Sequence, residues 1–167
     1  SENSAKVYIE TDLNGKGDGI TVKHEIKSPD GVTLSTSDAS ASGNLYVAET
    51  NIERPMLWDT KNPNLYQLIT TIYANGELVD TETTKFGIRD LKFTKEDGFF
   101  LNGKHLRIQG VCLHHDNGPL GAVVNRRAIE RKLQIMKDMG VNSVRTSHNM
   151  PSPELLDLCD KMGILVQ

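Results

Sequence analysis

The sequence predicts a multidomain chain that combines β and α/β structure. We expect an immunoglobulin-like β-sandwich over residues 1–87 and a βαβαβ segment within residues 88–167. Apolar residues recur with period two in the first part and with the 3.6-residue period of a helix after Asn125. All four tyrosines and the only tryptophan precede residue 88, whereas four of the five methionines follow it. Aromatic residues favour strands and methionine favours helices, so composition and periodicity divide the chain in the same way.

Short alternating runs separated by turns make up the first part. The predicted turns are Asn14-Gly15, Ser28-Pro29-Asp30-Gly31 and Asn75-Gly76, in which Pro and Gly supply the φ values of tight turns. Residues 65–73 are apolar on both faces, which predicts a central strand. His24 falls within an alternating run, and we interpret it as a structural or surface side chain. About six or seven short strands are typical of a sandwich, although the cysteine pair of antibody domains is missing.

A hairpin is predicted at the start of the second part. Residues 99–101 lead into Asn102-Gly103, a strong hairpin-turn signal, and residues 106–108 form the returning arm. We expect His105, just after the turn, to be exposed. Residues 106–111 then continue as a buried strand.

Two helices alternate with further strands after this point. Ile129, Leu133 and Met136 have helical spacing, and the helix begins at Asn125 as N-cap and ends before Gly140. Residues 141–145 form the next strand. The second helix begins with Ser152 as N-cap and Pro153 at its first position, and it ends at Gly163. Its apolar stripe consists of Leu155, Leu158, Cys159 and Met162.

Residues 164–166 begin a third strand, within which the sequence stops. A parallel sheet needs both faces covered and its edges completed, and domain boundaries fall in polar linkers. We therefore expect this chain to be an excerpt of a longer protein.

Composition excludes several classes of function. The net charge is −3 and the isoelectric point is about 5.9, which argues against sequence-independent nucleic-acid binding. No apolar run approaches the roughly 20 residues that span a bilayer, so we expect no membrane partner. No signal peptide is visible, and the compartment stays open: a periplasmic or secreted location would follow if one has been removed. We expect Cys112 and Cys159 to be small buried side chains rather than a disulfide or a metal pair.

Distinctive polar residues follow the first two strands of the α/β segment. They are His114, His115 and Asp116 after the first strand, and Arg145, His148 and Asn149 at the end of the second. The carboxyl ends of parallel strands are where α/β folds place their chemistry, so these residues form a candidate site. Arg145 ends a strand that should be buried, so a carboxylate partner is expected.

Other interpretations of these residues remain open at this point. The histidines could be exposed loop residues that bind backbone groups. They could also bind a metal, although His-His-Asp without helical spacing is a weak pattern, and we expect no metal site. Gly110, Gly118 and Gly121 lack the spacing of a dinucleotide-binding loop, and we expect no cofactor.

Four stretches of this sequence resemble glycoside hydrolase family 2, which contains β-galactosidases, β-glucuronidases and β-mannosidases. The family signature Asn-x-apolar-Arg, two small residues and His-Tyr-Pro is matched by Asn142-Ser143-Val144-Arg145-Thr146-Ser147-His148, and Asp160 and Gly163 follow at the family's spacing. The other stretches are Leu57-Trp58 with Asn62-Pro63-Asn64-Leu65-Tyr66, Thr84-Lys85-Phe86-Gly87-Ile88-Arg89, and Gly98-Phe99-Phe100-Leu101-Asn102-Gly103-Lys104. This resemblance implies an immunoglobulin-like domain followed by the first strands of a (β/α)8 TIM barrel.

The resemblance also implies roles for the candidate site residues. His148 would contact sugar hydroxyls, Arg145 would hold the nucleophilic carboxylate ionised and oriented, and His114 and Asp116 would shape the pocket floor. The sequence departs from the family at four positions: Asn149 and Met150 replace Tyr-Pro, Cys112 replaces the usual Asn, and His115 replaces the usual Glu. The Ser-His-Asn variant is most similar to a β-galactosidase branch.

No catalytic acid or nucleophile is assigned within this chain. The family's two glutamates come from later barrel strands, whereas Glu130 and Glu154 lie on the predicted helices. Retaining glycosidases need two carboxylic acids about 5–5.5 Å apart, so we expect this chain alone to be inactive and to self-associate through its unpartnered surfaces.

The parent protein is then a retaining β-glycosidase with a carbohydrate substrate, a β-D-galactoside by this resemblance. The alternatives are a β-glucuronidase or other family member, and a non-catalytic module that binds carbohydrate or packs against neighbouring domains.

Overall fold

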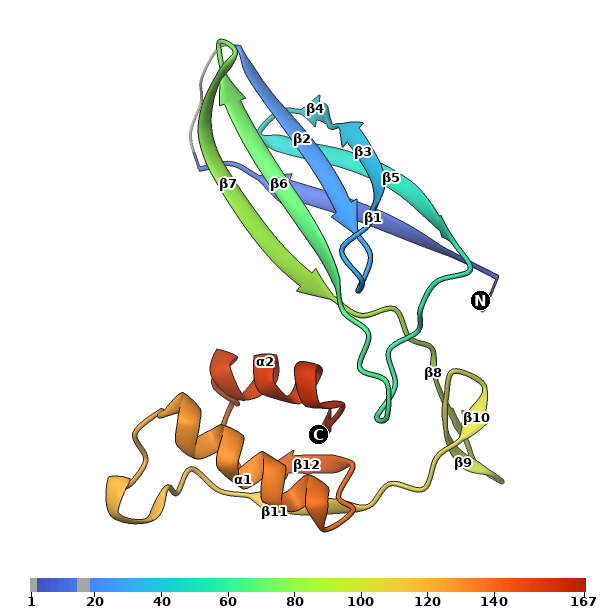
Figure 1. Cartoon of the computed structure of the whole chain (residues 1–167), viewed down its shortest axis with the longest axis vertical. Helices are drawn as coiled ribbons and strands as arrows, with labels where there is room; N and C mark the ends of the chain where they lie inside the picture. The colour runs from blue at the N-terminus through green and yellow to red at the C-terminus, as the bar shows by residue number, and fades with distance from the viewer. Residues whose placement is uncertain (1–2, 15–18) are drawn as a thin grey trace. The chain divides into compact units, whose positions relative to one another are not determined.

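A computed structural model describes residues 3–14 and 19–167 of the chain (Figure 1). They form two compact units, each of which takes two segments of the sequence. The first unit contains Ser1–Met56 and Leu65–Ile88, and the second contains Leu57–Asn64 and Arg89–Gln167. A loop inserted in the sandwich sequence therefore belongs structurally to the second unit.

The first unit is an antiparallel sandwich of two sheets. One sheet has the order β1-β5-β4, formed by β1 (Ser4–Asp12), β5 (Leu45–Glu53) and β4 (Ser40–Ser42). The other has the order β3-β2-β6-β7, formed by β3 (Thr33–Asp38), β2 (Ile20–Lys27), β6 (Tyr66–Ala74) and β7 (Glu77–Phe86). The predicted sandwich and the central position of the strand at 65–73 are confirmed.

Buried apolar residues from both sheets form the core of the sandwich. Ile9 and Ile52 come from one sheet, and Ile26 and Tyr66 come from the other. His24 is also buried, and its Nε2 lies 2.9 Å from Thr11 Oγ1 on the opposite sheet. Because burial disfavours the charged imidazole, it lowers the pKa of His24. His24 is therefore a structural residue.

Two of the three predicted turns lie in the described part of the sandwich. Asn75 and Gly76 both have positive φ, as the tight turn between β6 and β7 requires. The Gly31 N–H donates to the Ser28 carbonyl at 2.9 Å, which closes the second turn. The turn at Asn14-Gly15 extends into residues outside the described part.

A small three-stranded sheet opens the second unit. Its order is β10-β9-β8, formed by β10 (Lys104–His105), β9 (Gly98–Leu101) and β8 (Leu91–Thr94). The hairpin turn at Asn102-Gly103 and the exposure of His105 are confirmed. The returning arm, however, is β10 and not residues 106–108, which lie outside any strand.

The βαβαβ segment completes the second unit. It contains β11 (Gly110–Leu113), the short 3-10 helix η1 (Gly118–Leu120), α1 (Arg126–Asp138), β12 (Ser143–Thr146), α2 (Pro153–Met162) and β13 (Leu165–Val166). The strands pair in parallel in the order β11-β12-β13, as predicted. The first strand begins at Gly110 and not at Leu106, since the chain before it is held by side-chain hydrogen bonds from Asn142.

Both helices begin and end where the sequence predicts. The Asn125 side chain accepts from the Ala128 N–H at 3.0 Å, and the Ser152 side chain accepts from the Leu155 N–H at 3.3 Å. Gly140 and Gly163 adopt positive φ at the two carboxyl ends. Buried residues of both helices pack on one face of the sheet: Ile129, Leu133, Leu155, Leu158 and Cys159, with Val144 beneath them.

Within residues 3–14 and 19–167, no helix has the length and apolar character needed to cross a membrane.

Candidate functional site

The carboxyl ends of β11 and β12 carry polar side chains on the face opposite the helices. Val111, Leu113 and Val144 pack into the helical core, and successive side chains of a strand point to opposite faces. Cys112 and Arg145 are direct neighbours in the parallel register, so they lie side by side on the other face.

His114 and His148 come together just beyond these strands. Their ring centroids are 6.0 Å apart and the rings are nearly perpendicular, at 85°. His114 follows β11 directly, and Ser147, which precedes His148, is held by its N–H donating to the Leu113 carbonyl at 3.0 Å. Both histidines are exposed and therefore accessible to a ligand. The structure therefore brings these two strand-end residues together.

Arg145, on β12, has no ion-pair partner among the described residues. Its Nη1 lies 3.5 Å from Ser147 Oγ and 3.8 Å from Cys112 Sγ. The sequence predicts a carboxylate partner because it predicts that Arg145 is buried. Arg145 is in fact exposed, so its charge is solvated and needs no such partner within this chain.

The prediction of two buried cysteines is wrong for Cys112. Cys112 is exposed because it lies on the sheet face that α1 and α2 leave open, whereas Cys159 lies on α2 itself and is buried in the core between the helices and the sheet. Hydrogen bonds from the Ser147 hydroxyl and the Arg145 guanidinium hold the pKa of Cys112 below its usual value. Burial raises the pKa of Cys159 to about 12.

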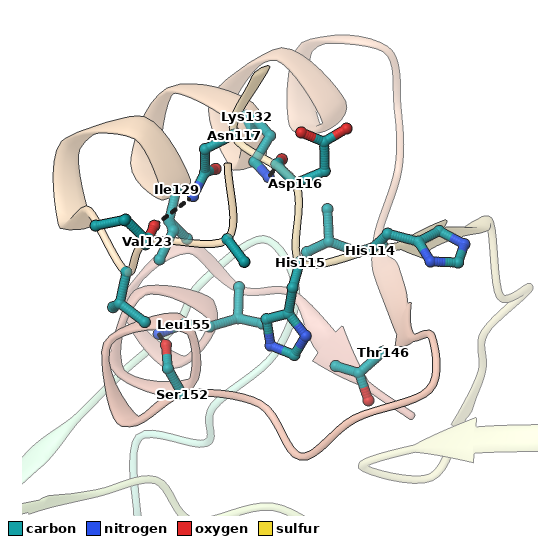
Figure 2. Close-up of a pocket in the computed structure, with 13 residues that line it drawn as sticks. His114, His115, Asp116, Asn117, Val123, Ile129, Lys132, Thr146, Ser152 and Leu155 are labelled. Carbon is teal, nitrogen blue, oxygen red and sulfur yellow. Dashed lines mark hydrogen bonds between the residues drawn. The ribbon is translucent and has the colours of Figure 1, made fainter. Parts of the chain in front are cut away.

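Asp116 braces the loop after β11 rather than facing His114. Its Oδ1 accepts from the Gly118 N–H at 2.8 Å, and its backbone carbonyl accepts from Lys132 Nζ at 2.7 Å. Asn117 continues this bracing, since its Nδ2 donates to the Val123 carbonyl at 2.8 Å (Figure 2). These hydrogen bonds attach the loop to α1. They therefore help to hold the backbone that follows β11, from which the His114 side chain projects.

His115 points away from His114 and lines a small pocket beside α2. Figure 2 shows its ring directed toward Ser152 and Leu155, whereas the His114 ring points away from them. His115 Nδ1 lies 3.2 Å from Asn149 Nδ2, which joins the loops after β11 and β12. Two of the positions that depart from the family pattern therefore contact each other.

Asn142, the first residue of the family signature, supports the fold at the opposite, amino end of the strands. Asn142 Oδ1 accepts from the Gln109 N–H at 2.8 Å, and its Nδ2 donates to the Arg107 carbonyl at 2.9 Å. Asn142 thus fixes the chain that enters β11.

Trp58 is the centre of a second group, which we call the Trp58 cluster: Trp58, Arg89, Asn102, Asp160 and the Thr60–Gly163 contact. Trp58 is 1% exposed, and its Nε1 donates to the Asp160 carbonyl at 2.7 Å. Asn102 Nδ2 donates to the Trp58 carbonyl at 3.0 Å, and the Arg89 guanidinium lies 4.7 Å from the indole centroid. Sequence reasoning noted these residues only as motif matches, because their contacts join distant segments.

The described residues contain no group of three or more His, Cys, Asp or Glu side chains that could hold a metal ion. Glu130 lies on α1 and pairs with Arg127 at 2.7 Å, and Glu154 lies in the first turn of α2. Neither is at the carboxyl end of a strand, where a catalytic acid of this arrangement would lie.

The fold and the strand-end residues together define an α/β segment with polar groups at the carboxyl ends of its parallel strands. Two family models identify the class further. The model described as "Glycosyl hydrolases family 2" matches residues 1–89, and that described as "Glycosyl hydrolases family 2, TIM barrel domain" matches residues 92–167. The chain belongs to glycosyl hydrolase family 2.

Individual relatives agree with this assignment. The chain is 43% identical over 173 residues to the β-galactosidase BoGH2A of Bacteroides ovatus, covering 99% of this chain and 20% of that protein. A crystal structure of a β-glycosidase from Bacteroides vulgatus matches with a TM-score of 0.89 at 36% identity, over 99% of this chain and 21% of that one. The Parabacteroides merdae β-glucuronidase matches with a TM-score of 0.87 at 29% identity, over 98% and 21%. The chain thus spans about a fifth of the length of these relatives.

Proposed function

We propose that this chain is the immunoglobulin-like domain and the first part of the TIM barrel of a retaining β-glycosidase. Its substrates would be terminal non-reducing β-D-galactosides. The observation that carries the proposal is the pairing of His114 and His148 at the carboxyl ends of adjacent parallel strands. TIM-barrel enzymes build their active sites at this end of the strands. The 43% identity to a β-galactosidase supports the choice of sugar.

In this proposal His148 stabilises the transition state through a sugar hydroxyl. The oxocarbenium-like transition state gains from hydrogen bonds to ring hydroxyls that strengthen as charge develops. A neutral imidazole donates such a bond without adding positive charge near the anomeric carbon. The edge-to-face contact with His114 restricts how the His148 ring can turn.

Arg145 would hold the nucleophilic carboxylate, which lies outside these 167 residues. Its guanidinium is exposed and has no acidic partner among the described residues, so it is free to receive a carboxylate from elsewhere in the protein. A nearby guanidinium keeps a carboxylate ionised, as nucleophilic attack requires. His114 and Asn149 would line the pocket, and Asp116 would act through the loop that it braces.

The test is a pair of assays with a chromogenic β-D-galactoside. We expect the 167-residue chain to show no turnover, because it lacks the acid and the nucleophile, and to self-associate in light scattering. We expect the product of the whole open reading frame to hydrolyse the substrate with retention of anomeric configuration. Turnover by the short chain, or inversion by the long one, would refute the proposal.

A β-glucuronidase is the second candidate, and the 29% identical Parabacteroides merdae structure supports it. The same enzyme assayed on a chromogenic β-D-glucuronide separates the two candidates. A higher kcat/KM on the glucuronide than on the galactoside would select this second function.

A further inference from the structure

We infer that His115 and Asn149 form a specificity pair, in which His115 orients the Asn149 carboxamide so that its carbonyl oxygen faces a substrate hydroxyl. The inference rests on the proposed function and deepens it, because it favours a neutral sugar over a uronic acid.

The contact itself fixes which atoms of the two side chains face each other. Asn149 Nδ2 lies 3.2 Å from His115 Nδ1. An amide nitrogen can only donate, so Nδ1 must be the acceptor and the His115 ring must carry its proton on Nε2. The Asn149 Oδ1 atom then lies at the other end of the carboxamide, and no partner for it is found among the described residues.

The position of Asn149 gives its free oxygen access to a ligand. Asn149 is exposed and follows His148 directly, at the end of β12 where the proposed sugar pocket lies. His115, in contrast, points into the small pocket beside α2 and does not face His114 (Figure 2). His115 is therefore a positioning residue, and Asn149 is the residue that would touch the substrate.

A carbonyl oxygen distinguishes two classes of sugar by their hydrogen-bonding chemistry. In this proposal the Asn149 oxygen faces the group on C5 of the sugar, where it accepts a hydrogen bond from the hydroxymethyl group of a galactoside. The carboxylate of a glucuronide is only an acceptor and carries negative charge, so the two oxygens would repel each other.

The pair also accounts for why two departures from the family pattern occur together. His115 stands where Glu is usual and Asn149 where Tyr is usual, and the two side chains contact each other across the loops. Substituting either one alone would leave the other without its partner.

The test measures kcat/KM on a β-D-galactoside and on a β-D-glucuronide with the product of the whole open reading frame. We expect Asn149→Ala to lower galactoside kcat/KM about tenfold, the scale of one hydrogen bond. We expect Asn149→Lys to raise the glucuronide-to-galactoside ratio by about tenfold or more, since an ammonium attracts the carboxylate. His115→Ala should shift the ratio in the same direction, and the double alanine variant should lose no more than Asn149→Ala alone.

Met150→Ala is the matched control, because Met150 is the next residue and is 88% exposed with no polar contact to lose. It should leave the ratio unchanged. Two results would contradict the proposed specificity pair without affecting the proposed glycosidase function. They are an unchanged glucuronide-to-galactoside ratio of kcat/KM in Asn149→Lys, and additive losses of kcat/KM in the double alanine variant.

A second measurement is independent of turnover. Nitrogen NMR of the histidine-labelled product of the whole open reading frame should show His115 as the Nε2–H tautomer, and the Asn149→Ala variant should shift it toward a tautomer mixture. If the wild-type enzyme hydrolyses neither sugar, both the proposed glycosidase function and the proposed preference for a neutral sugar are wrong. A tautomer that does not respond to Asn149→Ala would overturn the pair by itself.

Discussion

The Trp58 cluster and the strand-end histidines lie in the same unit, and each group contains residues that carry the resemblance to the family, such as Trp58 and His148. Trp58 is 1% exposed and takes part in two hydrogen bonds and a cation–π contact. His114 and His148, in contrast, are exposed and meet only through a ring contact. Satisfied, buried contacts stabilise a fold, whereas accessible groups with free hydrogen-bonding capacity are available to a ligand. Motif membership alone therefore does not tell a structural residue from a functional one.

Their positions along the strands support the same division. The Trp58 cluster contacts the carboxyl end of α2, which leads into the amino end of β13. The two histidines, in contrast, follow the carboxyl ends of β11 and β12. In TIM barrels, the amino end of the strands contributes to stability and the carboxyl end contributes the chemistry. Substitutions in the two regions should thus separate loss of stability from loss of activity.

Trp58→Ala should give the largest loss of stability. Removing a fully buried aromatic side chain costs about 3–5 kcal/mol, and the Asp160 carbonyl at the end of α2 also loses its donor. Urea unfolding followed by circular dichroism measures the loss. Trp58→Phe keeps a ring beneath Arg89 and should cost less, about 1–3 kcal/mol. Equal and small losses for both variants would contradict the structural role of the cluster.

Gly163→Ala should be the next largest effect, and Gly140→Ala is its control. Both glycines have positive φ after a helix, 70° and 87°, where an L-residue costs about 1–2 kcal/mol. A Cβ at 163 would also lie 2.6 Å from the Thr60 carbonyl oxygen, whereas one at 140 meets nothing within 4 Å. We expect Gly163→Ala to cost about 1–3 kcal/mol more than Gly140→Ala. Fluorescence of the single tryptophan reports unfolding of this unit, and identical midpoints would contradict the contact.

Two aspartates of α2 should give the smallest effects, with opposite signs. Hydrogen bonding and charge from Lys161, and then Arg126, hold the pKa of Asp157 below its usual value. Asp160 is exposed as a residue, but partial desolvation of its carboxyl group raises its pKa. Asp157 thus adds stability above its unfolded pKa that is lost as the pH falls. Ionised Asp160 reduces stability at neutral pH, and that penalty disappears as the pH falls through its raised pKa.

At pH 7, Asp157→Asn should therefore lower the unfolding free energy by a few tenths of a kcal/mol, as for surface ion pairs. Asp160→Asn should raise it slightly. Urea unfolding of both variants at pH 7 and pH 3 measures these changes in unfolding free energy. Changes of the same sign at pH 7 would contradict the difference in environment between the two carboxylates.

Local features of this fold could be predicted from the sequence, and long-range contacts could not. The caps at Asn125 and Ser152 and the positive φ of Gly163 follow from the chemistry of one turn of chain. The insertion of Leu57–Asn64 into the second unit depends on hydrogen bonds such as that between Trp58 and Asp160, which are 102 residues apart. No local pattern encodes such a contact.

The candidate site could be predicted in part for the same reason. Placing His114 and His148 at neighbouring strand ends required only the parallel order of the strands. The exposure of Cys112 and the contact between His115 and Asn149 depend on which face of the sheet is covered and how two loops turn. Periodicity does not determine either of these.

The most direct test of the division between the two regions is to measure both activity and stability for His148→Ala. In the product of the whole open reading frame, kcat/KM on a β-D-galactoside should fall by roughly 10²–10³, the scale of losing one transition-state donor. In the 167-residue chain, the unfolding free energy from tryptophan fluorescence should change by less than about 0.5 kcal/mol, as for other exposed residues. Near-normal turnover, or a loss of stability comparable to that of Trp58→Phe, would contradict the account.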